Sequence, residues 1–137
     1  MDAICLLVAG MVRAMLPTTE FTLAWDHSVE KTRWEERYRV SGDELTLFEA
    51  RVQGLGAGME PASGATLHDG QWSWRPAVAR LDELRLTQSS YTRDWQLCWN
   101  TGCHALGDVV GTAPEGSVIA IQPCAMAGSA MSPRTFE

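Results

Sequence analysis

The sequence predicts an all-β fold, a small antiparallel β-sandwich or barrel of about seven or eight strands. Most segments alternate apolar and polar residues with a period of two, as half-buried strands do. Turn-forming residues separate these segments, and Asp69-Gly70 is a strong hairpin signal. No stretch of about ten or more residues has the 3.6-residue period of an amphipathic helix. Many short strands divided by turns are typical of sandwiches and barrels.

The chain has 137 residues, of which 45% are hydrophobic and 20% are charged, and its formal net charge is −6. This length is that of one domain, and the composition is sufficient for a buried core. The acidic balance argues against nucleic acid as a partner, because phosphate binding needs a basic surface. It also argues against strong binding to an anionic membrane surface. A cationic partner, or solubility alone, fits the charge better.

Residues 1–14 include an apolar run from Ala3 to Val12 that is too short to span a bilayer. Its length suits the apolar region of a secretory signal peptide, and the small residues around position 14 suit a cleavage site. Asp2 and Arg13 depart from that pattern, and the alternatives are an N-terminal core strand or a wrongly assigned start. We expect export, a single domain over residues 20–124, and a flexible tail over residues 125–137.

The domain begins with three predicted strands. One face of the first carries alternate residues from Phe21 to Val29, and His27 belongs to it. The apolar face of the second runs from Trp34 to Val40 and includes Glu36. Residues 44–52 form the third strand after a turn. Further strands are expected as a hairpin over 66–74 and as single segments over 84–86, 95–99 and 117–122.

His27 and Glu36 are therefore polar residues on two apolar faces. If the hairpin pairs Trp34 with His27, and Glu36 with Trp25, the two polar residues lie diagonally, roughly 7 to 8 Å apart at Cα. A buried carboxylate needs such a partner. We favour a structural polar pair that fixes strand register. A ligand-binding role is the second hypothesis, and acid–base catalysis is the third because no further catalytic group is evident.

Cysteine usage indicates a disulfide. Cys5 falls in the N-terminal segment, which leaves Cys98, Cys103 and Cys124 in the predicted domain. A two-residue hairpin loop would place Cys98 opposite Cys103, roughly 4.5 to 5.5 Å apart at Cα and within disulfide range. A three-residue loop would spoil that register and leave Cys124 as the alternative partner. Zinc needs ligands that His104 alone does not supply, so we expect neither a metal nor a cofactor.

Other motifs carry weaker signals. The glycines from Gly54 to Gly58 lack the Lys-Ser/Thr of a nucleotide-binding loop and favour a turn or bulge. Ser28 points to the strand face opposite His27, which argues against a Ser–His nucleophile pair. The sequence contains no G-x-S-x-G elbow. A ligand-stacking surface is a further hypothesis for Trp72, Trp74 and Tyr91.

Three motifs carry a resemblance to a known family: W-x-H-S-V-E-K-T at Trp25–Thr32, E-x-Y at Glu36–Tyr38 and G-x-G-A-G-M at Gly54–Met59. With L-C-W at Leu97–Trp99, they resemble the bacterial family called domain of unknown function 1850, over roughly residues 20–124. The resemblance implies a small exported or membrane-anchored protein encoded beside tripartite solute transporters of the TRAP type, TAXI class. It implies no activity. The signature positions, which are the ligand-binding candidates, would be His27, Ser28, Glu36, Gly56, Ala57 and Gly58.

We therefore expect a periplasmic or otherwise extracytoplasmic accessory protein, with membrane association through the N-terminal segment as one variant. Its partners would be the transporter's membrane subunit, a solute-binding protein or a small-molecule solute. Direct binding of an organic anion would require Arg33, Arg37 or Arg39 in the site. A small hydrolase or isomerase using His27 and Glu36 as acid and base is the less favoured alternative. A purely structural envelope domain is another.

Overall fold

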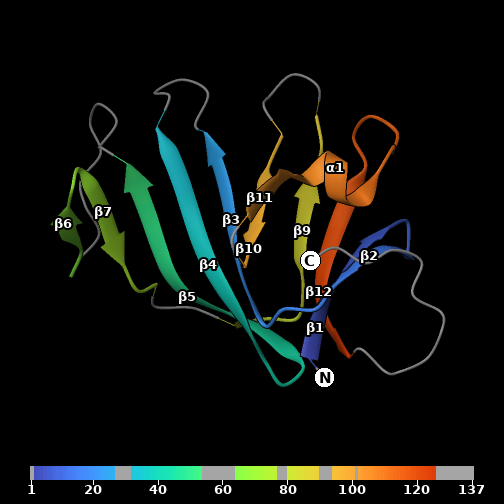
Figure 1. Ribbon diagram of the computed structural model, residues 1–137, viewed down its shortest axis with the longest axis horizontal. Helices are drawn as coiled ribbons and strands as arrows, with labels where there is room; N and C mark the ends of the chain where they lie inside the picture. The colour runs from blue at the N-terminus through green and yellow to red at the C-terminus, as the bar shows by residue number, and fades with distance from the viewer. Residues whose placement is uncertain are drawn as a thin grey trace.

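The computed structural model describes residues 2–26, 32–53, 64–76, 80–89, 94–100 and 102–125. Within these residues the chain forms two antiparallel sheets and one short helix, which confirms the predicted all-β fold (Figure 1). The order of the small sheet is β2 (Met11–Leu16), β1 (Asp2–Val8), β12 (Val118–Ala125) and β9 (Leu84–Thr87). The order of the large sheet is β11 (Gly102–Ala105), β10 (Gln96–Trp99), β3 (Glu20–Asp26), β4 (Arg33–Ser41), β5 (Glu44–Gln53), β7 (Gln71–Trp74) and β6 (Thr66–His68), with β8 (Arg80–Leu81) paired to β5.

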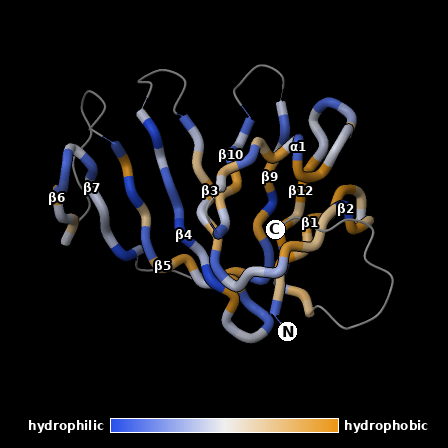
Figure 2. Tube along the Cα trace, in the orientation of Figure 1, coloured by the Kyte–Doolittle hydropathy of each residue, from blue (hydrophilic) through white to orange (hydrophobic). Residues whose placement is uncertain are grey.

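The core lies between the inner faces of the two sheets, the faces that they turn toward each other. On the small sheet, Leu6 of β1 lies opposite Ile121 of β12, and both side chains are fully buried. On the large sheet, Leu23 of β3 and Leu97 of β10 form a similar buried pair. Burying each such side chain stabilises the fold by about 1.5–3 kcal/mol. Figure 2 shows hydrophobic segments in β1 and β2, in contrast to the mostly hydrophilic β4.

The N-terminal segment is a core hairpin in this structure. Ala9 and Gly10, with φ of +52° and +77°, form the turn between β1 and β2. β1 pairs with β12 over its whole length, and a disulfide joins Cys5 to Cys124 with a Cα–Cα distance of 5.9 Å. The core-strand alternative describes this arrangement, and cleavage as a signal peptide stays a prediction. No helix in the described ranges has the length and apolar character to cross a membrane.

The register expected for the first hairpin is wrong by two residues. Trp25 lies opposite Trp34, and Glu36 lies opposite Leu23 rather than Trp25. The physical reason is the cross-strand aromatic pair: the two indole rings stack with centroids 6.3 Å apart and planes 11° from parallel. Such pairs stabilise one register over another. A shift of two residues keeps every side chain on its predicted face, so the inner and outer faces are as expected.

One helix was not expected. α1 (Leu106–Val110) lies at one end of the two sheets (Figure 1). Three of its side chains are buried, those of Leu106, Val109 and Val110. Asp94 Oδ2 accepts a hydrogen bond of 2.7 Å from the backbone N–H of Gly107 in the first turn. At the other end, Arg13 Nη1 donates to the carbonyls of Val110 (3.1 Å) and Thr112 (3.0 Å). A helix of five residues is too short to produce a recognisable period, so distant side chains rather than local sequence hold it.

The Asp69-Gly70 hairpin forms as predicted. Both residues have positive φ, +52° and +77°, as a type I′ turn requires, and they connect β6 to β7. The predicted tail over residues 125–137 falls, apart from Ala125 at the end of β12, outside the described residues.

Candidate functional site

His27, Ser28, Gly56, Ala57 and Gly58 lie outside the described residues. The described strands that precede the two motifs, β3 and β5, both end at the edge where β4 begins, the upper edge in Figure 1. The described ends of these strands, Asp26 and Gln53, therefore lie at the same end of the large sheet, on either side of β4.

Glu36 is the one signature residue that the structure describes, and its partner is Tyr38. The Tyr38 hydroxyl donates a 2.8 Å hydrogen bond to Glu36 Oε1 on the inner face of β4. Burial raises the pKa of the Tyr38 phenol, and the charge of Glu36 and this hydrogen bond raise it further. The hairpin register from which the acid–base hypothesis was argued differs from the observed one, and His27 itself lies outside the described residues. The described geometry supports a structural role for Glu36.

Four tryptophans extend from this region along the inner face. Trp25 stacks on Trp34 at 6.3 Å and meets Trp95 edge-on at 5.2 Å, and Trp34 meets Trp74 edge-on at 6.3 Å. All four side chains are half-buried. The Trp34 indole N–H and the Thr32 hydroxyl are buried without a hydrogen-bond partner in the part of the chain that the structure describes. The aromatic row therefore lies partly outside the closed core.

The outer face of β4 and β5 carries a chain of ion pairs. Glu35 pairs with Arg33 (3.1 Å) and Arg51 (3.3 Å). Glu49 pairs with Arg51 (3.4 Å) and Arg37 (3.1 Å). Partly exposed pairs of this kind contribute little stability each, about 0–1 kcal/mol. The ion pairs matter more for ligand binding. Arg33 and Arg37 already neutralise Glu35 and Glu49, so they are less available to an anionic ligand.

Arg39, the third arginine that the sequence suggested for an anion site, lines a groove of about 580 Å³ on this same outer face. We call it the arginine groove. Arg39, Arg75 and Arg80 are exposed, and none forms an ion pair with a carboxylate among the described residues. The full lining is Arg39, Ser41, Glu44, Thr46, Phe48, Arg75 and Arg80. Three guanidiniums and one carboxylate make this groove positive in an acidic protein.

Strand pairing assembles the arginine groove from distant parts of the sequence. Thr46 of β5 lies opposite Arg39 of β4 on one side and Arg80 of β8 on the other. A bulge in the β4–β5 register leaves Phe48 as an extra residue, and its ring lies 4.2 Å from the Arg39 guanidinium carbon. A cation–π contact of this kind orients a guanidinium while leaving its N–H donors available.

Sequence reasoning missed Arg75 and Arg80. Both lie outside the strands that alternation predicts, and β8 contains two residues, too few for a periodic signal. Arg80 reaches the groove because β8 adds to the edge of β5 beyond the end of β7. No local sequence feature indicates that pairing.

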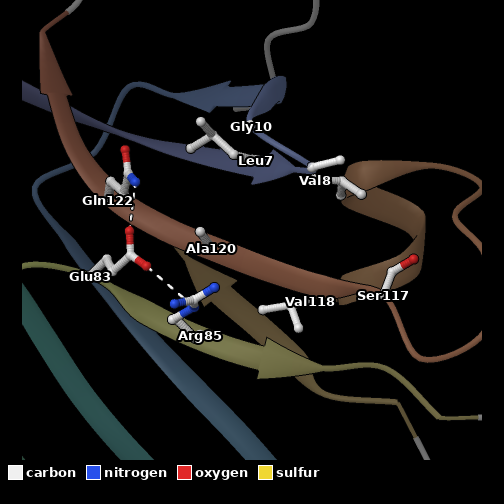
Figure 3. A pocket seen from close by; sticks show the side chains of 10 residues that line it. Leu7, Val8, Gly10, Glu83, Arg85, Ser117, Val118, Ala120 and Gln122 are labelled. Atoms are coloured by element: carbon white, nitrogen blue, oxygen red, sulfur yellow. Dashed lines mark hydrogen bonds and ion pairs between the residues drawn. The ribbon is translucent and has the colours of Figure 1, made fainter.

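A second hollow, of about 370 Å³, lies on the outer face of the small sheet. Figure 3 shows Glu83 held from two sides, by a 2.7 Å hydrogen bond from Gln122 Nε2 and a 3.5 Å ion pair with Arg85. The charged groups in this hollow, Glu83 and Arg85, therefore neutralise each other. Apolar residues such as Leu7 and Val118 form much of the remaining lining. A charged ligand would have to break the Glu83 contacts, so the arginine groove is the better candidate site.

The cysteines form two disulfides. Cys98 of β10 pairs with Cys103 of β11, directly opposite across a two-residue turn, with a Cα–Cα distance of 4.0 Å. Of the two alternative partners for Cys98, the structure therefore shows Cys103. Cys124 forms its disulfide with Cys5. Among the described side chains, no group of three or more His, Cys, Asp or Glu residues could hold a metal ion.

The fold and the groove define a small all-β domain with two disulfides and an open basic groove. Residues 21–106, more than half of the chain, match the family described as Domain of unknown function (DUF1850), and the chain belongs to this family. No curated protein matches the chain, and neither does any solved structure.

Proposed function

We propose that the protein is an extracytoplasmic accessory protein, without catalytic activity, that binds a carboxylate-bearing ligand in the arginine groove. The observation that carries the proposal is the presence of three guanidiniums, from Arg39, Arg75 and Arg80, with no carboxylate of the chain paired to them in the described residues. Arginine is suited to this task because its planar fork of donors matches a carboxylate bidentately.

The size of the arginine groove supports a small ligand or the acidic end of a larger one. Small-molecule sites commonly have volumes of about 300–1,000 Å³, and this groove has about 580 Å³. The Ser41 and Thr46 hydroxyls, which hydrogen-bond to each other at 3.1 Å, add polar atoms that can orient a bound group. Glu44 favours a ligand that also carries a cationic or hydroxyl group near its carboxylate.

Two further observations support the compartment and the partner system. Two disulfides are typical of proteins that fold in an oxidising compartment outside the cytosol. The motif resemblance noted above supports an accessory role beside a TRAP-type, TAXI-class uptake system, whose solutes or subunits would supply the carboxylate.

Calorimetric titration of the full chain tests the proposal. The probes are succinate, citrate and glutamate, with succinamide as the uncharged control. We expect saturable binding of at least one carboxylate, weakened by salt because the pairing charges are exposed. A ligand at a hundred-fold excess over its dissociation constant should also stabilise the fold by about 2.7 kcal/mol.

Substitutions identify the groove as the site. Arg39→Gln and Arg80→Gln should each weaken binding roughly ten- to hundred-fold, because a hydrogen bond to a charged group contributes about 1.5–3 kcal/mol. Arg85→Gln is the matched control, since it removes the same charge from an exposed arginine on the other sheet. Equal weakening by Arg85→Gln, or no binding of any carboxylate, would overturn the proposal.

A further inference from the structure

The two disulfides occupy contrasting positions. Cys5–Cys124 joins residues 119 apart across the two central strands of the small sheet, and Cys5 is 5% exposed. Cys98–Cys103 joins residues five apart across the hairpin of β10 and β11. β11 is an edge strand of the large sheet, and Cys103 is exposed while Cys98 is half-buried. A reductant can therefore reach the second bond without opening a sheet.

Reduction of Cys98–Cys103 would leave the core intact. The neighbours of Cys98 in β10, Leu97 and Trp99, are buried on the inner face, so alternation places the Cys98 sulfur on the outer face. β10 stays in place in either redox state because it also pairs with β3. The bond closes a loop of about six residues, so its chain-entropy contribution is smaller than that of Cys5–Cys124. Its loss would loosen β11 and little else.

We propose that Cys98–Cys103 is a thiol–disulfide exchange site, which accepts electrons from a dithiol protein while Cys5–Cys124 stays oxidised. The chemistry follows from access. A thiolate of the dithiol attacks the exposed Cys103 sulfur, the Cys98–Cys103 bond breaks, and Cys98 leaves as a thiolate that takes a proton from water. The second thiol of the dithiol protein, as its thiolate, then attacks the sulfur of the same protein that is bonded to Cys103. This breaks the mixed disulfide and releases Cys103 as a thiolate, which takes a proton from water. Two electrons pass to the protein, and the dithiol becomes a disulfide.

The first experiment measures thiol accessibility in the native full chain. The protein is incubated with increasing dithiothreitol, trapped with N-ethylmaleimide and mapped by peptide mass spectrometry, while far-UV circular dichroism follows the fold. We expect label on Cys98 and Cys103 with an unchanged spectrum, and label on Cys5 and Cys124 only after denaturation. Simultaneous labelling of all four cysteines, or labelling that requires loss of the spectrum, would overturn the proposal.

A second experiment tests the exchange step. A dithiol protein that lacks its resolving cysteine cannot complete the reaction and should remain attached as a mixed disulfide. We expect this adduct on Cys103, and none on the Cys98→Ser/Cys103→Ser double variant, which retains the other disulfide. An adduct on Cys5 or Cys124, or the absence of any adduct under conditions that reduce Cys98–Cys103 with dithiothreitol, would contradict the proposed route.

Discussion

Tyr38 donates its hydroxyl hydrogen to Glu36 at 2.8 Å, across one intervening residue of β4. Residues two apart on a strand lie on the same face, so this contact needs no other strand. Tyr38 is 2% exposed and stacks on Phe21 with ring centroids 5.3 Å apart, which fixes the position of its hydroxyl. Glu36, a polar residue on the inner face, thus finds its hydrogen-bond partner, Tyr38, on the same strand.

Removal of that hydroxyl should destabilise the fold. Tyr38→Phe keeps the ring contact with Phe21 but leaves Glu36 without this donor, and we expect a loss of about 1–2 kcal/mol. Glu36→Gln keeps an acceptor oxygen and should cost less. Urea unfolding of the two variants and the wild type checks this order. A larger loss for Glu36→Gln would indicate that the carboxylate has a second, stronger role.

The raised pKa of Tyr38 predicts a stability change at alkaline pH. An unfolded tyrosine ionises near pH 10. Below that pH the phenol is neutral in both the folded and the unfolded chain, so its full contribution to the free energy of unfolding is present. Above it the unfolded chain loses a proton that the folded chain keeps, so the free energy of unfolding should fall by about 1.4 kcal/mol per pH unit.

Tyr38→Phe provides the comparison for this slope. Urea unfolding between about pH 9 and pH 11 should show a steeper fall for the wild type than for the variant. Parallel curves would mean that Tyr38 ionises in the folded protein as readily as in the unfolded chain.

Arg13 should contribute to stability through helix α1. Arg13→Ala removes donors to the two carbonyls at the helix end, and we expect a loss of about 1–3 kcal/mol. Arg13→Lys keeps the charge without the fork of donors and should recover part of this loss. Thermal unfolding measures both, with the exposed Arg85→Ala as the control. An effect no larger than that of Arg85→Ala would contradict the capping role.

The two disulfides should differ in their contribution to stability. The chain-entropy relation gives about 5 kcal/mol for a loop of the Cys5–Cys124 length and about 2 kcal/mol for that of Cys98–Cys103. We therefore expect Cys5→Ala/Cys124→Ala to be the more destabilised of the two double variants. Guanidinium unfolding of both checks the order, and the reverse order would show that packing around each bond outweighs loop length.

Deletion of residues 1–14 separates the two interpretations of the N-terminus. The deletion removes β1, most of β2 and Cys5, so we expect a chain that does not unfold cooperatively and that aggregates. Calorimetry and size-exclusion chromatography follow this. A shortened chain that folds as a monomer with a sharp transition would instead support cleavage as a signal peptide.

Apolar–polar alternation and turn-forming residues predicted most strands of the large sheet, because both signals depend only on residues that are neighbours in the sequence. The register of β3 and β4 was not predictable in the same way. Registers two residues apart place the same side chains on the same faces, so period two cannot distinguish them. The Trp25–Trp34 contact decides between them, and it depends on three-dimensional packing.

Other features were hidden because their partners are remote. Arg13 departs from a cleavage-site pattern when only neighbouring residues are considered, yet it binds carbonyls almost one hundred residues further along the chain. Arg80 joins Arg39 only through the pairing of β8 with β5. The sequence therefore predicted one arginine of the candidate site, Arg39 on the outer face of β4. It did not predict the other residues that complete the groove.

The pairing of β1 with β12 sets the order of events during synthesis. β12 is the last strand of the described chain and separates β1 from β9 in the small sheet, so that sheet cannot assemble until residue 125 has been made. Contacts between such distant segments slow folding, because the chain loses loop entropy before they form. Until then the β1–β2 hairpin leaves Ile4 and Leu6 without their cover. The growing chain therefore exposes the apolar side chains of this hairpin from the synthesis of residue 16 until that of residue 125, and a holding chaperone would bind there.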